Sequence, residues 1–126
     1  MATFRYWNEN PNGEKRNDCV TRAITFANGM GMGYPEVRKM LYHSAKLLKC
    51  PKLCPTCYSF AIQEVLGGVP TNCNGMTVGE FADKHPKGTY LIRIQGHLLA
   101  IKDNCVYDLW DNRNRFCDLA WKMPNN

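Results

Sequence analysis

The sequence predicts an α+β fold in which N-terminal helices pack on a C-terminal antiparallel sheet. Two features of the apolar pattern lead to this prediction. Apolar residues recur every three or four positions in the N-terminal half, as they do on one face of a helix. After Gly88 the apolar period becomes two, which is the period of a strand. A block of helices followed by a block of strands is typical of the α+β class, with one sheet face packed on the helices. The length of 126 residues suits a single domain over residues 1–126.

Four helices are expected, each with its own start signal. Residues 1–18 are rich in turn-forming side chains and are expected to be extended or looped. Asp18 has the chemistry of an N-cap for a helix over 19–28, and Pro35 suits the first turn of a helix that ends near Lys49. A third helix is expected at 59–66. The pair Thr77 and Glu80 forms a capping box for a short helix that ends at His85.

The strands are expected at residues 89–95, 97–102, 105–110 and around 116–122. Asp103 and Asn104 are residue types that a tight hairpin turn accepts. A turn there pairs residue 102 with 105, 99 with 108, and 97 with 110. His97, Asp108 and Trp110 then share one face of the hairpin, whereas Asp111 points to the other face. We therefore expect a hydrogen bond between His97 and Asp108.

Cys19 completes a set of side chains with catalytic chemistry. It lies in the first turn of the expected helix, where the helix dipole favours a thiolate. A thiol nucleophile, an imidazole base and a carboxylate that orients the base are the parts of a catalytic triad. Trp110 beside His97 and Asp108 would exclude water and strengthen their hydrogen bond.

Three short motifs resemble the papain-like cysteine peptidase superfamily: Asn17-Asp18-Cys19 opening a helix, Gly96-His97 opening a strand, and Asp108-x-Trp110. They look most similar to the bacteriocin leader-peptidase-like branch and to small bacteriophage and bacterial proteins of the same build. The resemblance covers residues of about 10–30 and 88–112. It implies a papain-like fold and hydrolysis of a peptide or amide bond, in a peptide or protein substrate, by Cys19, His97 and Asp108.

One position departs from the family pattern. The family usually carries a glutamine six residues before the cysteine, as part of the oxyanion hole, and this sequence has Gly13 there. An amide donor could instead come from Asn12 or Asn17, together with the backbone N–H of Cys19. The loss of one oxyanion donor typically costs about 10²–10³ in rate.

Seven cysteines, an odd number, exclude a fully paired disulfide framework within one chain. The first residues lack the apolar stretch of a secretory signal, so we expect a cytoplasmic location with reduced thiols. The spacing of Cys50, Cys54 and Cys57 would allow a structural zinc site, with Cys73 or His43 as fourth ligand. A reduced, partly buried loop over 50–57 and a redox-active pair are the alternatives. No other cofactor is expected.

The composition argues against two classes of partner. The longest uncharged apolar runs fall far short of the roughly 18 residues of a membrane span. The net charge of +5 is modest for a nucleic-acid-binding protein. Five basic residues lie close together in the sequence, namely Arg38, Lys39, Lys46, Lys49 and Lys52. Several of them are expected on the solvent-exposed face of the second helix, where such a run of charges ordinarily serves only solvation. The alternative to an enzyme is a non-catalytic phage or bacterial accessory protein that uses the same scaffold to bind and block a protein partner.

Overall fold

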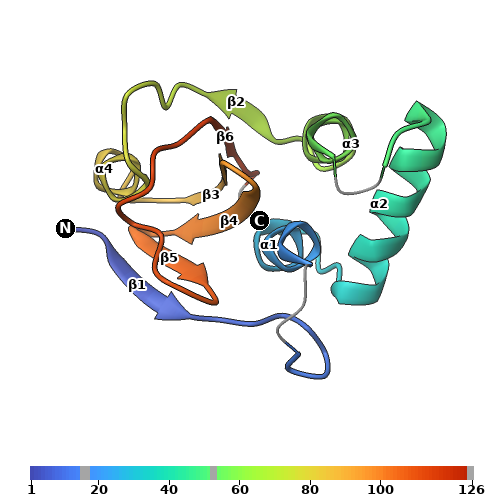
Figure 1. Cartoon of the computed structure of the whole chain (residues 1–126), viewed down its shortest axis with the longest axis horizontal. Helices are drawn as coiled ribbons and strands as arrows, with labels where there is room; N and C mark the ends of the chain where they lie inside the picture. Colours follow the sequence, from blue (N-terminus) through green and yellow to red (C-terminus); the bar gives the residue numbers. More distant parts are fainter. Residues whose placement is uncertain (15–17, 52–53, 125–126) are drawn as a thin grey trace.

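The computed structural model describes residues 1–14, 18–51 and 54–124, which fold as helices around one sheet (Figure 1). The helices are α1 (Cys19–Ala27), α2 (Tyr34–Leu48), α3 (Pro55–Phe60), which continues as the π-helical segment η1 (Ala61–Val65), and α4 (Val78–Lys84). The strands are β1 (Thr3–Tyr6), β2 (Val69–Thr71), β3 (Thr89–Ile94), β4 (His97–Lys102), β5 (Cys105–Asp108) and β6 (Leu119–Lys122). The predicted α+β class is confirmed.

The sheet has the strand order β1-β5-β4-β3-β6-β2 and is mostly antiparallel. The predicted hairpin register is confirmed, since Lys102 pairs with Cys105 and Ala100 with Tyr107. Asp103 and Asn104 have φ values of 48° and 65°, the left-handed conformation that a two-residue hairpin turn requires. This register carries His97 and Asp108 to the same end of the hairpin.

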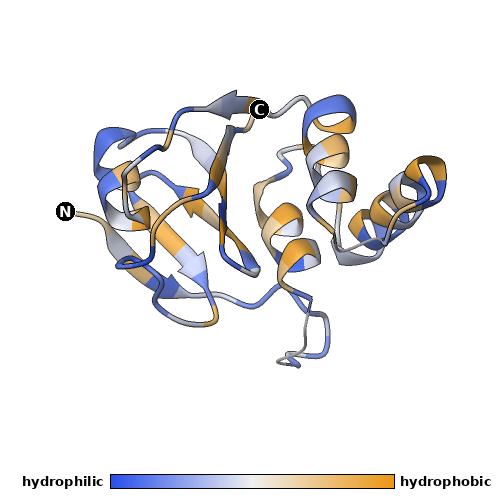
Figure 2. Cartoon of the chain, turned by 45° about the horizontal axis from the view of Figure 1, so that its top comes forward, coloured by the Kyte–Doolittle hydropathy of each residue, from blue (hydrophilic) through white to orange (hydrophobic). Residues whose placement is uncertain are grey.

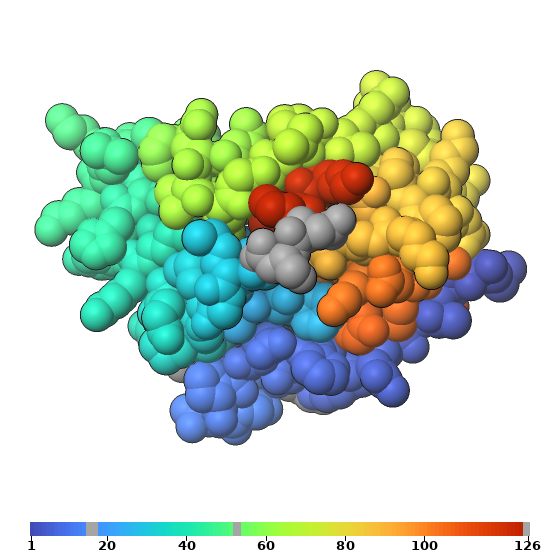
Figure 3. All heavy atoms as spheres, turned by 180° about the vertical axis from the view of Figure 1, so that it is seen from behind, coloured from blue at the N-terminus to red at the C-terminus, as the bar shows by residue number. Residues whose placement is uncertain are grey.

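Several boundaries differ from the prediction. The segment 1–18 contains strand β1, which pairs in parallel with β5, and Figure 3 shows the blue N-terminal segment beside the orange residues of that region. Strand β5 ends at Asp108, two residues earlier than predicted. Helix α3 begins at Pro55 rather than at residue 59, because proline suits the first helical turn. Cys57 is therefore helical and not part of a loop.

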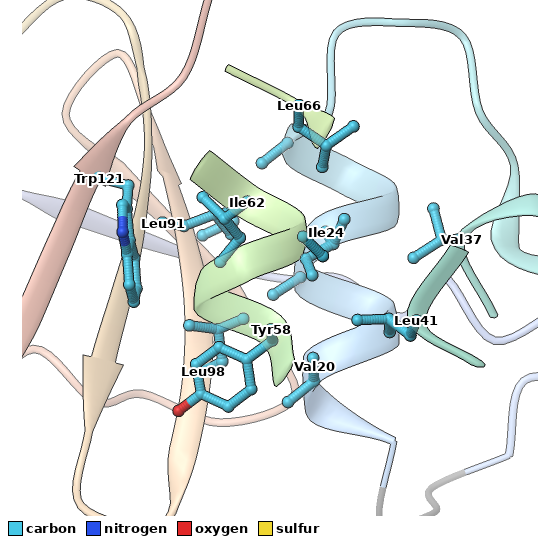
Figure 4. Close-up of a cluster of buried hydrophobic side chains, with 14 of the residues drawn as sticks. Val20, Ile24, Val37, Leu41, Tyr58, Ile62, Leu66, Leu91, Leu98 and Trp121 are labelled. Atoms are coloured by element: carbon cyan, nitrogen blue, oxygen red, sulfur yellow. The ribbon is translucent and has the colours of Figure 1, made fainter. Parts of the chain in front are cut away.

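Helices cover both faces of the sheet, so the expectation of a single covered face is wrong. Along β3, Leu91 joins a core cluster with residues of α1, α2 and α3, whereas Tyr90 and Ile92 join a cluster that contains Phe81 of α4. This alternation follows from the period of two in a strand. Figure 4 shows the first cluster, in which Ile24 of α1 and Ile62 lie between α2 and the sheet.

The hydropathy of the elements agrees with this layering. Figure 2 shows hydrophobic segments on α1 and on the neighbouring strands, in the interior of the molecule. On α2 the basic residues Arg38, Lys39 and Lys46 are exposed, as a solvated helix face should be, and Lys49 after it is exposed too; Lys52 lies outside the described residues. In the described part of the chain, no helix combines the length and the apolar character needed to cross a membrane.

Candidate active site

Cys19, His97 and Asp108 come from three neighbouring elements. Cys19 is the first residue of α1, His97 the first residue of β4, and Asp108 the last residue of β5. Helix α1 packs directly on β4, and Val20 and Ile24 of α1 share a buried cluster with Leu98 of β4. The apolar face of α1 thus sets the start of the helix against the start of the strand.

Asp108 holds His97 in a fixed orientation. The Nε2 atom of His97 lies 2.6 Å from Oδ2 of Asp108, so the predicted hydrogen bond is confirmed. The carboxylate also accepts hydrogen bonds from the Leu109 N–H at 2.7 Å and from Nδ2 of Asn112 at 2.8 Å. Asp108 and Asn112 are buried, at 6% and 2% exposure. The carboxylate is therefore buried and held by three hydrogen bonds, as suits the orienting member of a triad.

Trp110 stacks on the ring of His97. Its ring lies 5.4 Å from that of His97, with an interplanar angle of 25°. The predicted proximity of Trp110 to His97 is confirmed, although Trp110 follows the end of β5 and remains half exposed. The indole covers the imidazole and favours its cationic form.

Cys19 and His97 line the same cleft, and the charge of each shifts the pKa of the other. Since Asp108 occupies Nε2, the nitrogen left to face the thiol is Nδ1. Burial lowers the pKa of His97, but hydrogen bonds and charge from Asp108 and Cys19 outweigh it and raise the pKa to about 9. Burial raises the pKa of Cys19, but hydrogen bonds with His97 and with the Leu98 backbone, and the positive charges of His97 and Arg22, lower it overall. These opposite shifts favour a thiolate–imidazolium pair at neutral pH.

A second buried charged cluster lies directly beside Cys19. The Asp18 side chain does not cap α1, contrary to prediction. It instead pairs with Arg22 at 2.9 Å and accepts hydrogen bonds from Asn10 at 3.0 Å and from the Tyr34 hydroxyl at 2.6 Å. This cluster ties the N-terminal loop, α1 and α2 together around the thiol. The i, i+4 spacing of Asp18 and Arg22 is the sequence signal that could have identified the pair.

A cleft of about 220 Å³ opens beside the thiol and the imidazole. Its lining also includes Pro55 and Tyr58 of α3 and Arg93 of β3. Arg93 pairs with Asp118 at 3.4 Å, and its positive charge acts on the Tyr58 hydroxyl. Sequence reasoning did not identify Tyr58 or Arg93, because neither belongs to a local motif. The cleft leaves Cys19 and His97 accessible to a small group.

Of the predicted oxyanion donors, Asn12 and the backbone N–H of Cys19 can be located in the structure. Asn12 is exposed, and its hydrogen bonds are to Asn10 and Glu14 of its own loop. Gly13 lies in the same turn with φ of 66°. Asn17 lies outside the described residues. The backbone N–H groups in the first turn of α1 have no acceptor within the helix, so they can serve as oxyanion donors beside Cys19.

The predicted zinc set is not assembled. Cys50, Cys54 and Cys57 lie around the start of α3, whereas Cys73 is buried in the core cluster that contains Phe81, with Cys117 packed against that cluster. His43 is exposed on α2. No set of three or more metal-ligating side chains in the described residues has the arrangement of a metal site. All seven cysteines are free thiols. Cys73 is wrong as a fourth ligand because packing places it on the opposite face of the sheet from α3.

Comparison of the chain with protein-family models, curated proteins and solved structures finds no match. Membership of this chain in the papain-like superfamily therefore stays a prediction, and the evidence for a function is the geometry of the site itself. That geometry provides a nucleophile, a general base that can become a general acid, and a carboxylate that orients it. Such a set can perform acyl transfer from an amide or ester to water.

Proposed function

We propose that this protein is a papain-like thiol hydrolase that cleaves a peptide or amide bond. The observation that carries the proposal is the placement of Cys19 and His97 in one cleft, with His97 hydrogen-bonded to Asp108 at 2.6 Å. Most cysteines at helix starts have no such partner, so neither the thiol nor the imidazole would support the proposal alone. Burial of the pair and the opposite directions of their pKa shifts add support.

The proposed reaction has two halves. The Cys19 thiolate attacks the substrate carbonyl, and the N–H groups at the start of α1 stabilise the oxyanion. His97, as the imidazolium, gives its Nδ1 proton to the leaving amine, which leaves a thioester on Cys19. Water then attacks the thioester as neutral His97 takes its proton, and the C–S bond breaks, which releases the acid product and restores the Cys19 thiolate and the imidazolium. Asp108 stabilises the imidazolium at each stage in which it forms.

The first test is site-resolved alkylation with iodoacetamide at pH 6–7. Cys19 should react faster than Cys50, Cys57, Cys73 and Cys117, whose pKa values are raised, because only the thiolate is an efficient nucleophile. Cys57 and Cys117 should react slowly, since burial raises their pKa values to about 11 and about 12. His97→Gln should slow the alkylation of Cys19 and leave the other thiols unchanged. Equal rates at all seven cysteines would contradict the proposal.

The second test measures turnover. The wild type and Cys19→Ala are incubated with a diverse mixture of synthetic peptides, and new termini are identified by mass spectrometry. We expect cleavage by the wild type that Cys19→Ala and His97→Gln both lack. If Cys19 is hyper-reactive but the mixture and a set of simple amides all stay intact, the hydrolase proposal fails and the non-catalytic binding alternative gains support.

A further inference from the structure

The cleft beside the proposed nucleophile contains two polar side chains that the proposed reaction does not use. Arg93 and Tyr58 line this cleft together with Cys19 and His97. The attack on the carbonyl and the two proton transfers need the thiol and the imidazole, and leave the guanidinium and the phenol without a role. Because all four side chains line one cleft, Arg93 and Tyr58 can contact the part of a substrate that lies next to the scissile bond.

The register of the sheet places Arg93 beside the proposed base. Arg93 of β3 pairs with Leu98 of β4, which is the residue after His97. Side chains that lie directly opposite each other on neighbouring strands have Cβ atoms about 4.5–5.5 Å apart. Gly96, in the turn between the two strands, has a φ of 73°. In the described part of the chain, no atom lies within 4 Å of the position that a Cβ of residue 96 would take. This end of the β3–β4 hairpin is therefore open.

The guanidinium of Arg93 retains donors for a further acceptor. Its Nη1 atom lies 3.4 Å from Oδ2 of Asp118, and the two side chains are 29% and 46% exposed. Exposed ion pairs of this kind typically contribute only about 0.2–1 kcal/mol. A guanidinium carries several N–H donors in a planar fork, so a single contact with Asp118 leaves most of them available. Asp118 therefore pairs with Arg93 without saturating it.

Tyr58 adds a neutral donor to the same cleft. Its ring is buried, at 4% exposure, and packs edge-on against Trp121 with the ring centroids 6.4 Å apart. Figure 4 shows the hydroxyl pointing away from the apolar side chains of Ile62 and Leu66. Burial raises the pKa of Tyr58, and the positive charge of Arg93 opposes that rise. The hydroxyl therefore keeps its proton at neutral pH and can donate it in a hydrogen bond.

The charge and the size of the cleft favour a small anionic group. Among the described residues that line the cleft, none is an aspartate or a glutamate, and Arg93 is the permanent cation. The volume of about 220 Å³ lies below the range of roughly 300–1,000 Å³ that is usual for small-molecule pockets. The cleft can thus admit one side chain or one end of a peptide. An arginine fork binds a carboxylate through two parallel hydrogen bonds.

We propose that Arg93 and Tyr58 form a carboxylate-binding subsite, so that the preferred substrates carry a carboxylate next to the scissile amide bond. This inference rests on the proposed hydrolase function of Cys19 and names the substrate class of that site. The carboxylate can belong to the side chain of a neighbouring Asp or Glu, or to the C-terminus of the peptide. Both sources present the same two oxygens to the guanidinium and the hydroxyl.

The first test needs no turnover. Cys19 is alkylated with iodoacetate, which carries a carboxylate, and separately with iodoacetamide, its neutral counterpart. The ratio of the two rates cancels any change in the thiolate fraction of Cys19. Arg93→Gln should lower the ratio of the iodoacetate rate to the iodoacetamide rate by at least about threefold. Arg93→Lys keeps the charge and should retain most of the ratio.

Arg113→Gln is the matched control for this test. Arg113 is also partly exposed and paired with an aspartate, but it lines a different cleft. Its replacement should leave the ratio at the wild-type value. The proposal is overturned if Arg93→Gln leaves the ratio unchanged, or if Arg113→Gln lowers it as much as Arg93→Gln does.

The second test identifies the source of the carboxylate. Peptides that the wild type cleaves are remade in matched pairs, with Glu or Gln next to the scissile bond and with a free or an amidated C-terminus. In one of the two pairs, the carboxylate form should have a kcat/KM at least about threefold higher, and Arg93→Gln should abolish that difference. Equal kcat/KM values within both pairs would overturn the proposal.

The two tests separate this inference from the proposed function. If Arg93→Gln lowers the alkylation ratio but no peptide is cleaved, the carboxylate-binding subsite stands and the hydrolase proposal fails. If peptides are cleaved but the ratio stays at the wild-type value in Arg93→Gln, the hydrolase proposal stands and the subsite fails.

Discussion

Replacing Asp108 with asparagine removes the negative charge that holds the proton on His97 while nearly preserving the shape of the side chain. The pKa of His97 is raised from 6.5 to about 9, which corresponds to roughly 3 kcal/mol in favour of the imidazolium at 1.36 kcal/mol per pKa unit. Asp108 and Cys19 share this effect, and burial opposes it. Without the carboxylate charge, we expect the pKa of His97 to fall by at least about one unit, or about 1.4 kcal/mol.

An NMR titration measures this pKa directly, because the chain has only three histidines. In the wild type, one imidazole should titrate near pH 9, and in Asp108→Asn the same signal should titrate closer to neutral pH. Alkylation of Cys19 at pH 8 should slow in parallel, since the neutral imidazole no longer stabilises the thiolate. Asp111→Asn is the matched control, because Asp111 pairs with Arg113 on the surface. An unchanged His97 titration in Asp108→Asn would refute the reasoning.

Two further predictions concern stability. Arg22→Met leaves a buried carboxylate without its cation and should lower the free energy of unfolding by about 3–5 kcal/mol in urea denaturation; Arg113→Met, at an exposed pair, should cost no more than about 1 kcal/mol. In Cys19→Ser, Asp108 still raises the pKa of His97, and the stability that this contributes is full below pH 6.5 and is lost as the pH rises through a folded-state pKa below the wild-type value of about 9. The free energy of unfolding of Cys19→Ser, compared with that of Cys19→Ser/His97→Gln, should fall by at most about 3 kcal/mol over this range. If the difference in free energy of unfolding between the two variants stays constant from about pH 6 to about pH 10, the prediction is wrong.

The predictable part of the fold was the part with local signals. The hairpin register follows from the turn residues Asp103 and Asn104 and from the period of two in the flanking strands. The first two helices follow from apolar spacing and, for α2, from Pro35, whereas the start of α3 at Pro55 was missed. By contrast, β1 pairs with β5 across about a hundred residues, and no local pattern encodes such a partner. The packing of α4 against the second face of the sheet likewise has no local sequence signal.

The same distinction applies to the candidate site. The contact of His97 with Asp108 was predictable because both residues lie on one hairpin. The contact of Cys19 with His97 depends on how α1 packs against β4, and the motifs alone could only indicate it by resemblance. Asn112 and Tyr34 reach the site from loop and helix positions with no local chemistry to mark them. Residues that support a site through tertiary contacts are therefore the ones that sequence reasoning misses.

The charges around Cys19 explain why the missed residues matter. Two buried carboxylates, Asp18 and Asp108, lie near the thiol at the start of α1. Either carboxylate, without a cation beside it, would raise the pKa of Cys19 and so disfavour the thiolate. Arg22 neutralises Asp18, and protonated His97 neutralises Asp108, so the thiolate faces two balanced pairs and the positive end of the α1 dipole. Loss of either cation would leave an uncompensated carboxylate beside the sulfur. We therefore expect the reactivity of Cys19 to depend on Arg22 as well as on His97, even though Arg22 lies outside the proposed triad.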